Sequence, residues 1–299
     1  MGSVSHARDY PWWVALYRLA ETPELVAPVL IAAFDGWIDA AGAATSAAAH
    51  IVGEAEPLAT FDGDLLFDYR SRRPVLDVID GTLTELAWPD LALGRARVEA
   101  RDLLVLHGPE PDFRWKELAE SFLDLSLRLG VVEWVSLGAI PAAVPHTRPT
   151  PVLATASKAG LLHDDEQQGP PGLLRVPAAA LSVAELAVSG SGIPAVGFYA
   201  QVPHYVGGPY PGATIAILEH LSRHLGVTIQ LGSLPDEANA QRSRLDAAVA
   251  QDDSARAYLE RLESLSGEER LPSGDELAAE IERFLSGSTG EEPNPFEGR

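Results

Sequence analysis

Short, continuous apolar runs alternate with amphipathic stretches along the chain, and several of these runs end at an acidic residue or a glycine. Apolar runs of four to seven residues without polar alternation are typical of strands buried on both faces of a parallel sheet. The runs expected to form such strands are Val29–Phe34, Leu58–Phe61, Leu103–Leu106, Val131–Leu137, Val152–Ala156, Ala195–Ala200 and Thr228–Leu231. Strands separated by helical patterns predict an α/β fold with a mostly parallel sheet.

Helical patterns fill the spaces between these runs. An alanine-rich segment up to His50 predicts the first helix, because alanine has the highest helix propensity and packs closely on a sheet. A second helix is expected over Phe113–Leu129, with Asp112 as its N-cap. Further helices are expected at Ala178–Val188 and before Leu225.

A β-hairpin interrupts the alternation of strands and helices. The β-forming stretches Val75–Ile79 and Thr82–Leu86 flank the dipeptide Asp80-Gly81, and an Asp-Gly pair in this setting is a strong hairpin signal. Two functions of this insertion remain open from the sequence. It covers an edge of the sheet, or it forms an arm that joins subunits.

The character of the chain changes after Ser233. One helical stripe runs to Leu262, and a second begins at a capping box at Ser273 and carries apolar residues up to Phe284. Residues 236–299 contain 16 acidic and 7 basic side chains. This divides the chain into a core over residues 1–232, with the hairpin insertion at about 75–86, and an acidic helical lid with a flexible tail over residues 233–299.

Composition and charge exclude several classes of protein. A net charge of −21 argues against nucleic acid and anionic membranes as partners, since both bind basic surfaces. The chain has no cysteine, so disulfides and thiolate metal sites are excluded. Neither an apolar run of about 18 residues nor a signal peptide is visible, and a cytoplasmic location is expected. No cofactor and no metal site are expected.

The first predicted strand ends in the densest group of candidate residues, Asp35, Gly36, Trp37 and Asp39. Ligands of α/β proteins bind at the carboxyl ends of parallel strands, so these residues are expected to line the main cleft. The two carboxylates could bind a metal or act as an acid–base pair. The simpler interpretation is that Asp35 shapes the turn and Asp39 caps the following helix.

Further candidate residues lie before the hairpin and at the end of another predicted strand. Arginines at 70, 72 and 73 suit the recognition of carboxylate or phosphate, and Arg70 is the one expected to point into the cleft. His107 ends a strand close to a helix start, which is a plausible anion site or an ordinary turn.

Two further strand ends present histidines in proline-rich loops. His146, Thr147 and Arg148 lie between prolines that stiffen their loop, and they form the strongest polar constellation in the chain. His204 and Tyr205 follow another strand and could reach the same crevice. The alternative is that these side chains hydrogen-bond within their own loops. No complete catalytic motif is present.

Five segments together resemble the PAC2 family, which is named after proteasome assembly chaperone 2. They are FDGWIDAAGAAT, FDYRSRRP, HGPEPDFRW, GAIPAAVPHTRP and FYAQVPHYVGGPYPGAT, and the resemblance extends over about residues 28–232. The hairpin and the acidic helical C-terminus look like the actinobacterial branch of the family. The resemblance implies a three-layer α/β/α core similar to the purine nucleoside phosphorylase and peptidyl-tRNA hydrolase-like folds, and a homo-oligomer, with a trimer plausible.

The resemblance implies no particular reaction, and two functions follow from it. The first is a chaperone-like binding or assembly protein with a ligand cleft at the strand ends. The alternative is a hydrolase or phosphorylase-like enzyme acting on a small anionic or nucleoside-like substrate, with the C-terminal helices as a lid.

Overall fold

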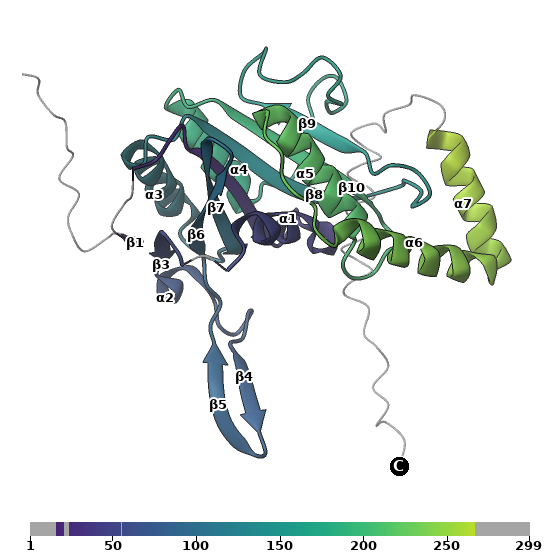
Figure 1. Cartoon of the computed structure of the whole chain (residues 1–299), viewed down its shortest axis with the longest axis horizontal. Helices are drawn as coiled ribbons and strands as arrows, with labels where there is room; N and C mark the ends of the chain where they lie inside the picture. The colour runs from purple at the N-terminus through teal and green to yellow at the C-terminus, as the bar shows by residue number, and fades with distance from the viewer. Residues whose placement is uncertain (1–15, 21–23, 55, 267–299) are drawn as a thin grey trace, which may run out of the picture.

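The computed structural model describes residues 16–20, 24–54 and 56–266, and eight of its strands form one mixed sheet (Figure 1). The order across the sheet is β1-β3-β6-β7-β2-β8-β10-β9. The strands are β1 (Tyr17–Leu19), β2 (Val29–Asp35), β3 (Ala59–Phe61), β6 (Ala92–Val98), β7 (Arg101–Pro109), β8 (Glu133–Ala142), β9 (Val152–Ala156) and β10 (Ala195–Pro203).

The centre of the sheet is parallel, as the apolar runs predict. Strands β7, β2, β8 and β10 run side by side in one direction, and Val29 at the start of β2 is in register with Leu103 of β7 and Glu133 of β8. The strands at both margins are antiparallel to their neighbours. The carboxyl ends of β2, β7, β8 and β10 therefore lie along one edge, where ligand sites of such folds form.

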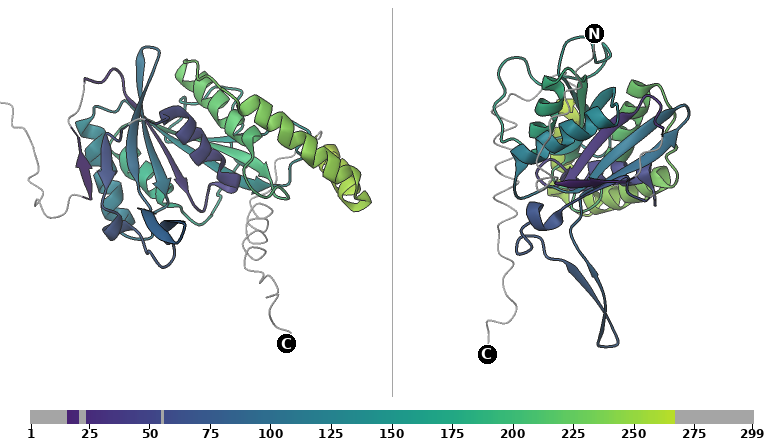
Figure 2. Two further views of the ribbon diagram at one scale, coloured as in Figure 1. Left: turned by 60° about the horizontal axis from the view of Figure 1, so that its bottom comes forward. Right: turned by 90° about the vertical axis from the view of Figure 1, so that its left-hand side faces the viewer.

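Helices cover both faces of the sheet and produce three layers (Figure 2). Apolar side chains of α1 and α5 form one core cluster with one face of the sheet, and those of α3 and α4 form a second cluster with the other face. The helices are α1 (Ala43–Val52), α2 (Gly63–Leu66), α3 (Trp115–Arg128), α4 (Ala180–Gly190) and α5 (Pro211–Leu225), with a short 3₁₀ turn η1 (Ala40–Gly42) before α1. The predicted α/β fold is confirmed.

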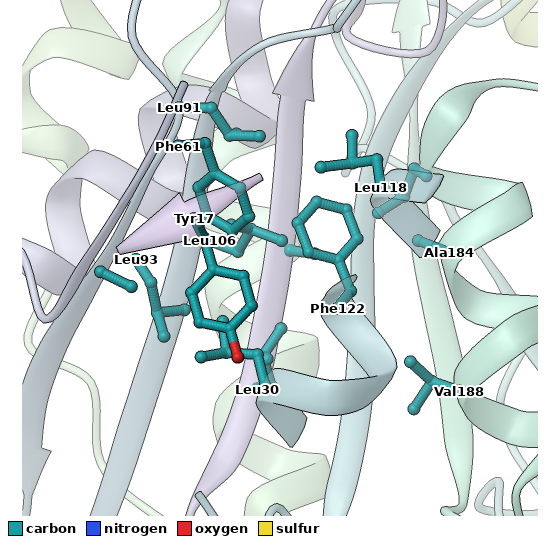
Figure 3. Packing of buried hydrophobic residues seen from close by; sticks show 14 of the residues in the cluster. Tyr17, Leu30, Phe61, Leu91, Leu93, Leu106, Leu118, Phe122, Ala184 and Val188 are labelled. Carbon is teal, nitrogen blue, oxygen red and sulfur yellow. The ribbon is translucent and has the colours of Figure 1, made fainter. Parts of the chain in front are cut away.

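Aromatic side chains fill the core on the side of α3. Phe122 of α3 is 1% exposed and packs edge-on against Phe61 of β3 (Figure 3). Tyr17 of β1 lies on the other side of Phe61, with ring centroids 5.9 Å apart. These contacts fasten β1 and β3, at the antiparallel margin of the sheet, to α3.

The hairpin is confirmed, but it covers no edge of the main sheet. Strands β4 (Val75–Ile79) and β5 (Thr82–Ala87) form a separate two-stranded sheet, and every residue in them is exposed. The hairpin projects away from the body in Figure 1 and in the right-hand view of Figure 2. Of the two functions considered, covering a sheet edge is therefore wrong.

Four details of the sequence interpretation are corrected by the structure. Residues 228–231 form no strand. β6, which pairs antiparallel with β7, was not predicted, because its alternating small and polar residues give no clear apolar run. Asp112 does not cap α3: the N-cap position is Arg114, and Asp112 accepts the backbone N–H of Asp68.

The fourth correction concerns the C-terminal region. The single helical stripe expected up to Leu262 consists of two helices, α6 (Leu234–Ala250) and α7 (Asp253–Ser266), which break at residues 251–252. The expected second helix, from the capping box at Ser273 to Phe284, lies outside the described residues. Within the described part of the chain, no helix is long and apolar enough to cross a membrane.

Candidate functional site

A cavity of about 420 Å³ opens at the carboxyl ends of β2 and β7, beside the first turns of α1. Its lining consists of Asp35 and the backbone and side chains of His107–Pro109 at the strand ends, and of Thr45, Ser46 and Ala49 from the helix. Parallel pairing places Ala33 opposite His107 and Asp35 opposite Pro109, which brings these strand ends level. Two of the residues expected in a cleft, Asp35 and His107, thus share this cavity.

Asp35 is held by an arginine, but not by the expected one. The guanidinium of Arg72 donates to Asp35 Oδ2 at 2.6 Å and to the Asp35 carbonyl oxygen at 3.3 Å. Arg70 lies in the exposed turn that precedes the hairpin, and its backbone N–H donates to Asp68 Oδ1. The pair with Asp35 is largely exposed, so it contributes only ~0–1 kcal/mol to stability.

Asp39 has the capping role. Its Oδ1 accepts the backbone N–H of Ala44 at 2.7 Å, and its carboxylate also accepts the hydroxyl of Thr45. Burial raises the pKa of Asp39, while the hydrogen bonds from Thr45 and Ala44 partly offset this effect. These contacts satisfy N–H groups in the first turn of α1 and place the carboxylate at the positive end of the helix.

Gly36 and Trp37 pack against the carboxylate of Glu110. Glu110 accepts the backbone N–H of Trp37 and, at 2.7 Å, the N–H of Ala180 at the start of α4. A Cβ at Gly36 would lie only 2.7 Å from Glu110 Oε2, so the close approach requires glycine. Glu110 therefore joins the turn after β2 to the opposite helix layer.

Burial favours the uncharged form of His107 in the cavity. Burial lowers the pKa of His107, and the neighbouring Asp90 carboxylate offsets part of that effect. A neutral imidazole can accept a proton or a hydrogen bond from a ligand. His107 and the hydroxyl of Ser46 both line the cavity, which gives it the polar groups that a small ligand needs.

His146 belongs to a different group, under the C-terminal helices. Its side chain is 1% exposed, its Nδ1 lies 2.8 Å from Tyr205 Oη, and its Nε2 lies 3.2 Å from Asp246 Oδ1 of α6. The backbone N–H of His146 also donates to Tyr205 Oη. Burial raises the pKa of Tyr205 to about 12, so its hydroxyl is no nucleophile near neutral pH.

The neighbouring candidates also contact the C-terminal helices. The hydroxyl of Thr147 donates to Glu263 of α7. His204 Nε2 lies 3.2 Å from the hydroxyl of Tyr258, also on α7, while its Nδ1 lies 3.1 Å from the carbonyl oxygen of Ala142. α6 and α7 are therefore fastened to the loops after β8 and β10.

The candidates thus separate into two groups. Asp35 and His107 line the cavity, whereas the lining includes none of the residues His146, Thr147, His204 and Tyr205. Arg148 is exposed, and its backbone N–H donates to the carbonyl oxygen of Pro145.

Sequence reasoning did not identify several of the residues that contact the candidate side chains. Arg70 was expected in the cleft in place of Arg72, and the partners from α6 and α7 lie about 50 to 120 residues from the loops that they contact. The sequence contains no signal for contacts across such separations.

The fold and these contacts define a three-layer α/β/α protein with a strand-end cavity, a projecting hairpin and C-terminal helices docked at the same edge of the sheet. The chain belongs to the PAC2 family, whose family model matches residues 33–249. Among curated proteins, none matches the chain.

Solved structures extend this result. A proteasome-assembly chaperone homologue of Mycobacterium tuberculosis is 36% identical, with 77% of this chain and 99% of that chain covered and a TM-score of 0.71. A protein of unknown function from the same organism is 31% identical, with 95% and 100% covered and a TM-score of 0.80. An archaeal proteasome activator from Pyrococcus furiosus shares the fold at 16% identity, with 78% and 97% covered and a TM-score of 0.61.

Proposed function

We propose that this chain is a chaperone-like assembly protein that acts as a homo-oligomer, plausibly a trimer, and binds protein partners through the hairpin β4–β5. The observation that carries the proposal is the apolar surface of this hairpin, which nothing in the described chain covers. The similarity to a proteasome-assembly chaperone homologue supports subunits of a proteasome core particle as the partner class.

The strand register places four of the six exposed large apolar side chains of the hairpin on one face, whereas Val75 and Ile79 lie on the opposite face. Leu76 is paired with Leu86, and Val78 is paired with Leu83 across a bulge after Asp77. Cross-strand partners share a face, and residues two apart on one strand do so as well. These four side chains are 45–68% exposed, so they form a continuous apolar face.

An isolated hairpin with such a face is unusual for a protein that acts alone. Two-stranded sheets are marginally stable in water, and exposed apolar patches mark interaction sites. Burying one valine or leucine side chain stabilises by about 1.5–3 kcal/mol. A partner that covers the four side chains therefore gains a substantial binding free energy and orders the hairpin at the same time.

The base of the hairpin is fixed to the body. Tyr69, before β4, and Trp88, after β5, pack edge-to-face with ring centroids 4.7 Å apart. The hydroxyl of Tyr69 also donates to Asp64 of α2. Arg72 adds the ion pair to Asp35. A fixed base presents the apolar face in a defined direction, which lowers the entropic cost of binding.

The test is the assembly of a proteasome core from separately purified actinobacterial α and β subunits, followed on native gels and by light scattering. We expect the protein to bind unassembled subunits and to change the rate of assembly. The variant Leu76→Ser/Leu83→Ser should lose both effects, whereas Asp77→Ser/Glu85→Ser, on the opposite face, should retain them. Absence of binding to any subunit by the wild-type protein would refute this partner class.

The cavity supports a second, separate proposal, a site for a small ligand. The imidazole of His107, the hydroxyl of Ser46 and Asp35 with its partner Arg72 suit a nucleoside-like or small anionic molecule, and a hydrolase or phosphorylase-like reaction there is the alternative function. Thermal-shift measurements against nucleosides, nucleotides and phosphate test it. A ligand at 100 times its Kd stabilises by ~2.7 kcal/mol, and His107→Ala should abolish the shift.

A further inference from the structure

The strand-end cavity holds polar groups that make no hydrogen bond to the rest of the described chain. This is true of both ring nitrogens of His107 and of the hydroxyl of Ser46. Asp35 accepts the guanidinium of Arg72 on Oδ2, but its Oδ1 has no partner among the same residues. His146, by contrast, has hydrogen-bond partners on both ring nitrogens. Polar groups without partners at the wall of a cavity indicate a ligand that supplies them.

These groups lie on one face of the sheet. Ala33 and Val105 belong to the core cluster on the side of α1. Asp35 and His107 each follow one of them by two positions, so their side chains lie on the same side. Parallel pairing of Ala33 with His107 places Asp35 two residues further along the neighbouring strand, about 8 Å away for a strand spacing of ~4.8 Å and a rise of ~3.3 Å per residue. Ser46 lines the same cavity from α1, so a single small ring can reach all three groups.

The charges around the cavity disfavour an anion. Its lining contains no lysine or arginine, and Arg72, which approaches from outside the lining, is paired with Asp35. The carboxylate of Asp90 acts on His107 and adds a second negative charge at this edge. The positive end of α1 is occupied by the carboxylate of Asp39, which accepts N–H groups of the first turn. A phosphate or carboxylate therefore meets no unpaired positive group in this lining.

The unpaired groups match hydroxyls. Asp35 Oδ1 accepts a hydrogen bond, an uncharged imidazole has one donor and one acceptor nitrogen, and the hydroxyl of Ser46 donates and accepts. Neighbouring hydroxyls on a sugar ring also donate and accept, and the ring holds them in a fixed geometry. Ala49 and Pro109 supply apolar contacts in the same lining.

We propose that the strand-end cavity binds an uncharged sugar ring through its hydroxyl groups, with Asp35, His107 and Ser46 as their partners. The proposal rests on the ligand site in the proposed function and commits that site to the uncharged one of its two ligand classes. The ribose of a nucleoside and a free sugar offer the same chemistry, and the arms of the experiment distinguish these two sources.

The test is titration calorimetry of the full-length protein with four ribonucleosides, ribose, glucose, adenosine monophosphate and inorganic phosphate. We expect an uncharged compound to bind more tightly than either anion. Tighter binding of a nucleoside than of both sugars identifies a nucleoside as the source, and equal or tighter binding of a sugar identifies a free sugar. Saturation-transfer NMR should show that the protons of the sugar ring contact the protein.

Loss of a single hydroxyl tests the contacts themselves. If the ligand is a nucleoside, its 2′-deoxy or its 3′-deoxy form should bind at least about tenfold more weakly, because a polar group of the cavity is then left unpaired. If the ligand is a sugar, the corresponding monodeoxy sugars serve the same purpose. Equal affinity for every deoxy form would contradict recognition through hydroxyls.

Variants locate the binding in this cavity. Asp35→Asn and His107→Ala should each weaken binding of the tightest uncharged compound at least about tenfold. The side chain of Asp35 is 59% exposed, so its replacement leaves the core intact. Glu120→Gln, which removes one charge on the exposed side of α3, is the matched control and should keep the affinity. Unchanged affinity in both cavity variants would overturn the proposal.

Two further outcomes separate this inference from the proposed function. Tighter binding of phosphate or adenosine monophosphate than of any uncharged compound overturns the inference, while the cavity remains a ligand site. Absence of binding by every compound overturns both the inference and the ligand site. Neither result bears on the assembly role, which is measured with proteasome subunits.

Discussion

Replacement of His146 by alanine should release α6 and α7 from the body while the sheet stays folded. The imidazole contacts the hydroxyl of Tyr205 on one side and the carboxylate of Asp246 on the other. α6 has no buried residue, and within the described part of α7 only Leu262 is buried. The docking of these helices therefore depends on a few contacts, of which His146 makes the most buried.

The expected magnitude follows from the hydrogen bond to Asp246, because the bond to Tyr205 joins two loops of the body and does not reach α6 or α7. A hydrogen bond to a charged group contributes ~1.5–3 kcal/mol. Water weakens this bond, because the side chain of Asp246 is 51% exposed, so its contribution falls at the lower end. His146→Ala should thus cost about 1.5 kcal/mol of docking free energy, which is roughly a tenfold change in the docking equilibrium.

Hydrogen exchange measures this change directly. Amides of α6 and α7 should exchange about tenfold faster in His146→Ala, whereas amides of β2 and β8 should keep their protection. Asp246→Asn, which retains a hydrogen-bond acceptor, should show a smaller effect. Equal loss of protection in the helices and the central strands would refute the reasoning, because it would mean that His146 supports the whole fold.

Three further predictions concern stability. Burial raises the pKa of Asp102, but hydrogen bonds from the Val26 N–H and Arg95 and the charges of Arg95 and Arg97 outweigh this effect and lower the pKa overall. The stability that this carboxylate contributes is therefore present above its unfolded pKa of about 3.9 and is lost as the pH falls through the lower folded pKa. Urea titrations should accordingly show that Asp102→Asn costs less unfolding free energy at pH 2 than at pH 7. A Cβ at Gly94 would lie 2.1 Å from Val52 Cγ2, so Gly94→Ala should destabilise by ~1–3 kcal/mol in thermal unfolding, and added Val52→Ala should recover part of the loss; additive effects would contradict the clash. Arg72→Ala should change the unfolding free energy by less than ~1 kcal/mol, because its pair with Asp35 is exposed, and a larger loss would show that the pair supports the fold.

The hydrophobic pattern predicted the architecture because strands buried on both faces of a sheet consist of continuous apolar residues. The buried run Val29–Phe34 forms β2 almost at the expected bounds. Residues 228–231 have the same composition as a strand, yet the Thr228 N–H donates to Glu99 and the stretch joins no sheet. Pattern alone cannot distinguish an apolar stretch that packs beside a sheet from one that pairs within it.

The polar sites were predicted less completely, because their partners depend on the tertiary fold. The strand ends were identified from local sequence, since a strand end is a local feature. The choice of Arg72 over Arg70 depends on the direction of a turn, and the contact of His146 with Asp246 depends on where α6 folds back. Neither is encoded in the spacing of residues along the chain.

The contrast between polar and apolar candidates carries the functional argument. Asp39 and His146 looked reactive in the sequence, but each has hydrogen-bond partners within the chain, so each has a structural role that explains it. A polar group that is already satisfied gains little from a further ligand, because a new bond must replace an existing one. The apolar face of the hairpin is about half exposed to solvent, and no other element of the described chain covers it. This exposed apolar surface is therefore the one that should determine what the protein binds.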